Sequence, residues 1–97
     1  MLMLITYDIN TETKEGQKRL RKAAKICTNY GQRVQNSVFE CSITPTQYLL
    51  IKDNLKKIIN PKTDSIRFYR LGKHWQNRVE TIGHDDTYDP DKGTIIL

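Results

Sequence analysis

The segment LMLITYD (residues 2–8) decides how this chain folds. It is a nearly continuous apolar run that stops at a carboxylate. Such a run is typical of a strand in the middle of a sheet, covered on both faces. We therefore expect Leu2 to Tyr7 to form a central strand. Asp8 then lies where this strand gives way to a polar connection, and the other elements pack around it.

Residues 16–30 show a different period. Apolar residues recur at helical spacing and basic residues cover much of the remaining surface, so this segment is predicted to be an amphipathic helix. Gly31 follows directly and is well placed to end the helix. The apolar positions are Leu20, Ala23, Ala24, Cys27 and Tyr30, and the basic positions are Lys18, Arg19, Arg21, Lys22 and Lys25.

A second helix carries its own start and stop signals. Thr44, Pro45 and Gln47 match a capping box with proline in the first turn, where a helix tolerates it. Asn60-Pro61 is the predicted stop. The stripe expected to be buried consists of Tyr48, Ile51, Leu55, Ile58 and Ile59.

Short strands account for the remaining regular structure. Residues 32–35 and 37–43 are predicted to form two strands that bend at Asn36 and Ser37, and DSIRFYRL (residues 64–71) is predicted to be a fourth strand. The order is then β-α-β-β-α-β. This order predicts an α+β fold, a ferredoxin-like sandwich with both helices on one face of an antiparallel sheet.

Two apolar segments remain, residues 79–83 and 94–97. Neither can bury itself alone, and pairing with a sheet edge, of this chain or of a second subunit, would satisfy its backbone groups. We expect a domain over residues 1–83 and an acidic C-terminal tail over residues 84–97. We also expect an extra C-terminal strand to pair across a homodimer.

Charge is unevenly distributed along the 97 residues, which suffice for one domain. Residues 1–84 carry fifteen Lys/Arg against seven Asp/Glu, a net charge of +8, whereas residues 85–97 carry −3. A basic body favours a polyanionic partner such as nucleic acid. The alternative is that the charge serves solubility alone.

Several classes of function and location are disfavoured. Cys27 and Cys41 lie fourteen residues apart without a CxxC motif, which argues against zinc and favours buried, reduced thiols. His74 and His84 lack the neighbours of a catalytic triad, and the glycines lack phosphate-loop spacing. The N-terminal apolar run is too short for a signal sequence or membrane span, so we expect a cytoplasmic protein with no membrane partner.

Asp8 is the first candidate functional residue. A carboxylate at the end of a buried strand faces its ligand from a rigid support. Magnesium is usually held by one or two carboxylates together with waters and phosphate oxygens. A two-fold axis would supply the second Asp8, so metal binding and dimerisation would be one property. The alternative is an Asx turn or local cap.

The basic surface is the second candidate. Beyond the first helix it would include Arg33, Lys52, Lys56, Lys57, Arg67, Arg70, Lys73 and Arg78. Contacts from these residues would go to phosphates and would not read sequence. Bases could stack on Phe39, Phe68, Tyr69 or Trp75, although Phe68 and Tyr69 are also expected strand residues. The alternative is a solvated surface.

Four segments carry a resemblance to a known family. They are LITYDI (4–9), KRLRKAAKIC (18–27), YGQRVQNSVFEC (30–41) and SIRFYRLG (65–72). Along residues 1–83 the chain resembles the CRISPR-associated protein 2 family. Its RFYRLG segment looks most like members that accompany type I-C systems.

This resemblance implies an antiviral-defence function in spacer acquisition. Members are homodimers whose C-terminal strand packs against the partner's sheet, and they are described as metal-dependent endonucleases of double-stranded DNA or of RNA. They also bridge dimers of the CRISPR-associated protein 1 integrase. The resemblance implies that Asp8 and its symmetry mate bind Mg²⁺ or Mn²⁺. Positions implicated in catalysis or binding are Tyr7, Asp8, Arg33 and Phe39, with Arg19 and Arg21 in the first helix.

Three rival hypotheses stay open at this point. In the first, the chain serves as a DNA-binding scaffold without catalysis, with a structural role for Asp8. RVQNSVF (residues 33–39) superficially resembles the phosphate loop of acylphosphatases, but it follows the first helix and Glu40 stands where an arginine is needed. An RNA-recognition module shares the topology, but its glycine-aromatic pattern is missing from the third strand.

Overall fold

The computed structural model describes residues 1–71 and 79–84. Lys73, His74, Trp75, Arg78 and the tail residues 85–97, with the apolar segment 94–97, lie outside this part. No helix within it is long and apolar enough to cross a membrane. The elements are β1 (Leu2–Asp8), α1 (Lys14–Thr28), β2 (Gly31–Gln35), β3 (Val38–Ser42), α2 (Pro45–Ile58), β4 (Ser65–Arg70) and β5 (Val79–Gly83).

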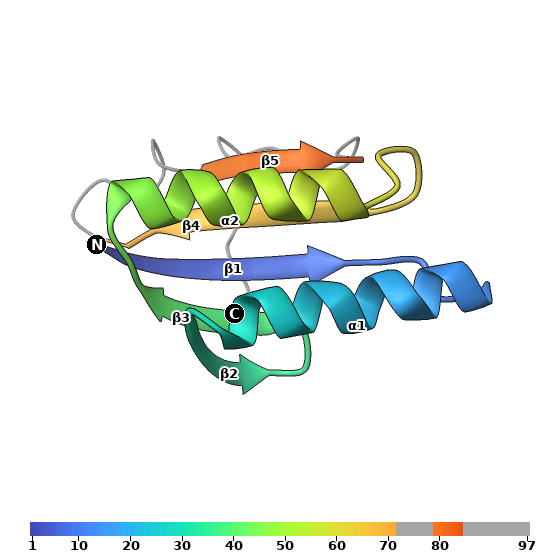
Figure 1. Ribbon diagram of the computed structural model, residues 1–97, viewed down its shortest axis with the longest axis horizontal. Helices are drawn as coiled ribbons and strands as arrows, with labels where there is room; N and C mark the ends of the chain where they lie inside the picture. The colour runs from blue at the N-terminus through green and yellow to red at the C-terminus, as the bar shows by residue number, and fades with distance from the viewer. Residues whose placement is uncertain (72–78, 85–97) are drawn as a thin grey trace, which may run out of the picture.

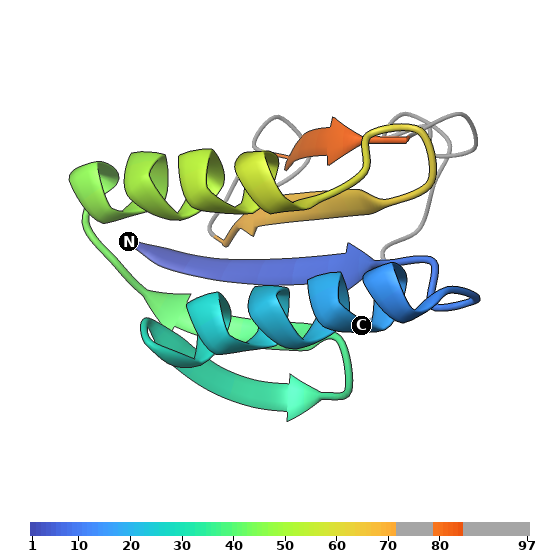
Figure 2. The same cartoon turned by 45° about the vertical axis from the view of Figure 1, so that its right-hand side comes forward.

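The strands form one antiparallel sheet in the order β2-β3-β1-β4-β5. Both helices lie side by side against one face of this sheet, and β1 runs through its middle (Figures 1 and 2). The predicted β-α-β-β-α-β order and two-layer α+β architecture are therefore confirmed, with β5 added beyond them.

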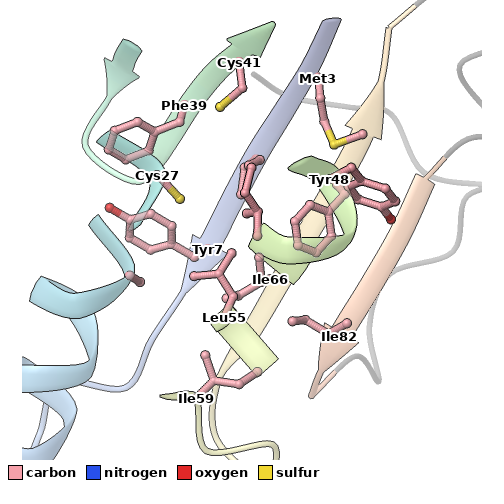
Figure 3. Packing of buried hydrophobic residues seen from close by; sticks show 14 of the residues in the cluster. Met3, Tyr7, Cys27, Phe39, Cys41, Tyr48, Leu55, Ile59, Ile66 and Ile82 are labelled. Carbon is pink, nitrogen blue, oxygen red and sulfur yellow. The ribbon is translucent and has the colours of Figure 1, made fainter. Parts of the chain in front are cut away.

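The core lies between the sheet and the helices (Figure 3). Because side chains alternate along a strand, Met3, Ile5 and Tyr7 point toward the helices, and all three are buried. On the other face Leu4 is also buried, but Leu2 is 42% exposed. The expected burial of β1 on both faces thus holds for Leu4 and not for Leu2.

Helix α1 begins and ends two residues earlier than predicted. Thr13 is its N-cap, and the Thr13 hydroxyl accepts a hydrogen bond from the Gly16 N–H. The role predicted for Gly31 as helix terminator is wrong, because Gly31 is the first residue of β2 and pairs with Cys41. A Cβ atom at Gly31 would lie 2.4 Å from the Cys41 Sγ, so close packing of the hairpin requires glycine there.

The start of helix α2 is confirmed in detail. The Thr44 hydroxyl accepts from the Gln47 N–H at 3.1 Å, and the Gln47 side chain accepts from the Thr44 N–H at 2.9 Å. The helix ends just before Asn60-Pro61. These paired bonds satisfy two backbone donors and set the angle at which the chain enters α2.

Strand β5 resolves one alternative left by the sequence. Residues 79–83 pair with β4 of the same chain. Glu80 of β5 accepts hydrogen bonds from the Tyr48 hydroxyl and the Lys52 ammonium, both on α2. These bonds tie the fifth strand to the helix layer as well as to the sheet.

We expect Thr44→Ala to lower the free energy of unfolding by about 1 kcal/mol, because it removes one half of the capping box. Urea unfolding monitored by circular dichroism measures this loss. Thr46→Ala changes an exposed threonine of the same helix and is the matched control. Equal losses in the two variants would contradict the role assigned to the cap.

Candidate functional site

Asp8 ends β1 and is exposed. Alternation along the strand places its side chain on the face of the sheet opposite the helices, which we call the open face. Its backbone pairs with Ser65 at the start of β4, and Ser65 in turn pairs with Gly83 at the end of β5. Within residues 1–71 and 79–84, its carboxylate forms no hydrogen bond or ion pair, so it is available to a ligand.

A second carboxylate, Asp64, lies buried directly before β4 with no exposed surface. Its Oδ1 accepts from the Asn10 N–H at 3.1 Å and from the Thr63 hydroxyl at 3.0 Å. Its Oδ2 accepts from the Asn60 N–H at 2.9 Å and from the Arg19 Nε at 2.7 Å. We call this four-bond arrangement the Asp64 clasp. It joins the β1–α1 connection, α1 and the α2–β4 connection.

The clasp also determines the ionisation of Asp64. Burial raises the pKa of the carboxyl group, but the hydrogen bonds from Arg19, Asn60, Asn10 and Thr63 outweigh this effect, so the pKa lies below its usual value. Sequence reasoning assigned Asp64 to the start of a strand and missed this role. The available signal was an acidic residue without acidic neighbours between Asp53 and Glu80, placed between Asn60-Pro61 and a buried strand.

The basic residues of α1 divide into two groups. Lys18, Arg21, Lys22 and Lys25 are exposed and recur at i, i+3, i+4 and i+7, so they form one stripe, which we call the α1 stripe. Arg19 is only 18% exposed and its Nε is turned to Asp64. The structure thus separates Arg19 from the other predicted phosphate contacts.

Tyr7, Phe39 and Arg33 lie together, but on the helix side of the sheet. The Tyr7 and Phe39 rings are 6.1 Å apart and stacked (Figure 3), and the Arg33 guanidinium lies 5.2 Å from the Phe39 ring centre. Burial raises the pKa of the Tyr7 hydroxyl, and the nearby Arg33 partly opposes this. These three candidates therefore cluster on one face while Asp8 points from the other.

Other candidate binding residues are engaged or buried. Lys52 pairs with Glu80, and Lys57 pairs with Asp53. The rings of Phe39, Phe68 and Tyr69 are buried, so none is accessible for stacking on a base in this structure. Both cysteines are buried and free, and burial raises the pKa of the Cys27 thiol to about 12, which makes it unreactive.

Comparison with known proteins identifies the family. The family model described as CRISPR associated protein Cas2 matches residues 1–79. The chain is 54% identical over its full length, and that of the relative, to a CRISPR-associated endoribonuclease Cas2 of Chlorobaculum tepidum. It is 53% identical to a CRISPR-associated endonuclease Cas2 of Halalkalibacterium halodurans, over 92% of this chain and 93% of that protein.

The chain belongs to the Cas2 family. The crystal structure of Streptococcus pyogenes Cas2 matches with a TM-score of 0.71 and 66% identity, over 86% of this chain and 100% of that one. The segments that carry the resemblance in the sequence lie mainly in β1, α1, the β2–β3 hairpin and β4.

The side chains near Asp8 determine whether this Cas2 chain could bind a divalent metal ion. Among the residues that the structure describes, no three His, Cys, Asp or Glu side chains lie close enough to hold an ion. Asp8 is an exposed carboxylate, the ligand type that Mg²⁺ and Mn²⁺ prefer. The donor chemistry therefore fits, but among the described residues only the Asp8 carboxylate is an evident ligand, and further ligands would come from a second copy, water or a phosphate.

The Asp64 clasp predicts a pH-dependent stability. Since folding lowers the pKa of Asp64, its contribution to stability is present above the pKa of the unfolded chain, near pH 4, and is lost as pH falls through the folded value. We expect Asp64→Asn to cost about 3 kcal/mol at pH 7, because it leaves Arg19 without its buried partner. That cost should shrink below about pH 4.

Urea unfolding of both proteins between pH 3 and pH 7 measures this difference. Asp53→Asn, which breaks an ion pair whose side chains are 60–70% exposed, should cost far less and is the control. A cost of Asp64→Asn that is the same at pH 3 and at pH 7 would contradict the assignment.

Proposed function

We propose that this chain acts in the cytoplasm as a homodimer that binds double-stranded DNA and cleaves nucleic acid as a divalent-metal-dependent endonuclease. The observation that carries the proposal is Asp8, a carboxylate exposed at the end of the central strand, where its backbone pairs with Ser65 of β4. Membership of the Cas2 family and the nuclease names of its relatives support the same activity.

Asp8 of two copies would hold Mg²⁺ or Mn²⁺ at a two-fold axis. When bound, the ion supplies Lewis-acid stabilisation of charge on the scissile phosphate and lowers the pKa of a water nucleophile. The chain's own part is to present the carboxylate from a rigid strand end, which limits the reorganisation needed when the phosphate arrives. Arg33, Tyr7 and Phe39 lie on the other face and would support the sheet rather than contact the reacting atoms.

The open face supports the homodimer. Leu2 and Val34, which is 49% exposed, are apolar residues that a monomer leaves in water. Leu4, Val34 and Val38 line a hollow of about 300 Å³, together with Gln35 and Glu40. Packing two open faces together would cover these side chains and would place both copies of Asp8 on the packed faces of the dimer. The extra C-terminal strand that the sequence predicts to pair across a homodimer would add to this interface.

The α1 stripe supports nucleic-acid binding. Its four cations have no acidic partner within the described residues and span about 10 Å along the helix, a distance that covers several phosphates of a duplex. Such contacts hold the backbone without reading its sequence. Both helices lie against one face of the sheet (Figure 2), and Asp8 points from the other face. A dimer of open faces would therefore leave both stripes on its outside.

The cellular role follows from the family. We assign the dimer to spacer acquisition, where it would bridge the CRISPR-associated protein 1 integrase while DNA lies across the basic surface. The RFYRLG segment favours members of type I-C systems. RNA is the alternative substrate for cleavage, and the endoribonuclease names of several relatives favour it.

A non-catalytic scaffold is the second candidate function. It is favoured by the sparse donor set, because the described residues gather no group of three or more His, Cys, Asp or Glu side chains that could hold a metal ion. In this case the dimer would hold DNA for the integrase, and Asp8 would serve the interface between the copies.

We expect Asp8→Asn to abolish cleavage of plasmid DNA and of single-stranded RNA in a magnesium titration, because the amide removes the charge that holds the metal. Asp53→Asn, an exposed carboxylate of α2, is the matched control and should cut at the wild-type rate. An Asp8→Asn protein that cuts like the wild type would exclude the proposed mechanism. Metal-independent DNA binding with no Asp8-dependent cutting of either polymer would support the scaffold.

We expect Lys18→Gln, Lys22→Gln and Lys25→Gln together to weaken duplex binding more than Asp8→Asn does. Each lost phosphate contact removes about one unit from the slope of log affinity against log salt, so the slope should fall by about three. Fluorescence anisotropy between low and physiological salt measures both quantities. Lys57→Gln, whose lysine is paired with Asp53, is the control. An unchanged slope in the triple variant would show that DNA binds elsewhere.

A further inference from the structure

We propose that Asp64 is a positioning residue that holds Asp8 in place for metal binding. This inference rests on the proposed function, because it concerns the metal that Asp8 would bind. Asp64 would not touch the metal or the substrate. It would act through the backbone of the β1–α1 connection and through the strand pair β1–β4.

Asp64 contacts the chain on both sides of the site. Its Oδ1 fixes the Asn10 N–H, two residues after Asp8, and the next residue, Ser65, pairs directly with Asp8. The Asp64 carbonyl accepts from the His84 N–H at 2.7 Å, just after β5 ends. One residue therefore restrains the connection that leaves Asp8, the strand beside Asp8 and the end of the next strand.

Two glycines show how closely this end of the sheet is packed. A Cβ at Gly16 would lie 1.9 Å from the Asn10 carbonyl oxygen, and a Cβ at Gly83 would lie 2.2 Å from the Asp64 carbonyl oxygen. Gly83 also has a φ of +92°, a conformation that side chains disfavour. Backbone thus packs against backbone on each side of the clasp, and a shift of Asp64 cannot be absorbed by a flexible side chain.

Arg19 completes the arrangement from α1. Its Nε donates to the Oδ2 of Asp64 and holds the first half of the helix against the same carboxylate that bonds Asn10, in the segment that follows Asp8. A residue outside the ligand set that orients a ligand commonly changes metal affinity 10- to 100-fold when it is replaced. Asp64 would have that effect here without contacting the ion.

The test measures metal binding directly, without cleavage. Mn²⁺ is titrated into the folded full-length dimer and free Mn²⁺ is followed by electron paramagnetic resonance, for wild type, Asp8→Asn, Asp64→Asn and Glu80→Gln. The matched control is Glu80→Gln, because it also removes a carboxylate that ties elements together. Glu80 lies opposite Phe68, on the helix side and three pairs along β4 from Ser65.

We expect Asp64→Asn to raise the Mn²⁺ concentration at half-saturation by about tenfold or more. Glu80→Gln should lower thermal stability but leave half-saturation unchanged. Arg19→Gln keeps the Asp64 carboxylate and removes its helix partner. Arg19→Gln should also raise the Mn²⁺ concentration at half-saturation. It replaces Asp64→Asn as the test variant if Asp64→Asn does not fold, as judged by circular dichroism and sedimentation.

The outcomes separate this inference from the proposed function. If Asp8→Asn abolishes Mn²⁺ binding but Asp64→Asn and Arg19→Gln bind like the wild type, the positioning role is overturned and the metal site stands. If Glu80→Gln shifts half-saturation as much as Asp64→Asn, the effect is one of general stability and the inference fails. If the wild type binds Mn²⁺ no better than Asp8→Asn, both proposals fail.

Discussion

The two-residue period of β1 is the constraint on which the rest of this structure depends. Met3, Ile5 and Tyr7 point toward the helices and belong to the hydrophobic core. The alternate residues, ending at Asp8, point to the open face. A strand shifted by one residue would bury the carboxylate and expose the core. The same register therefore determines both the stability of the sheet and the side on which a ligand can reach Asp8.

The Asp64 clasp stabilises the end of the sheet next to Asp8. An exposed carboxylate at the end of a strand lies where a sheet begins to fray, since strand pairing ends there. Asp64 supplies buried, charge-assisted hydrogen bonds next to that end, and Arg19 keeps its charge compensated. Among the described residues, Asp64 is the fully buried charged residue, and it lies at the end of the sheet where the candidate site is.

Binding and catalysis occupy different faces in the proposed function. The α1 stripe lies on the helix layer, whereas Asp8 lies on the open face, so a single chain does not bring them together. A dimer of open faces would place the carboxylates inside and the cations outside. Tyr7 and Asp8, which the family resemblance names together, are adjacent residues of β1 and therefore point to opposite faces of the sheet.

The sequence by itself determined the order of the elements, the capping box at Thr44 and the exposed end of β1, because each depends on residues close together in the chain. Only the tertiary structure decided the partner of Arg19, which lies 45 residues away, and the role of Gly31, which depends on the opposing Cys41. An arginine in a basic stripe looks like its neighbours until a buried carboxylate from a distant segment packs against it. Long-range packing therefore divided the candidate residues into those that face solvent and those that hold the site in place.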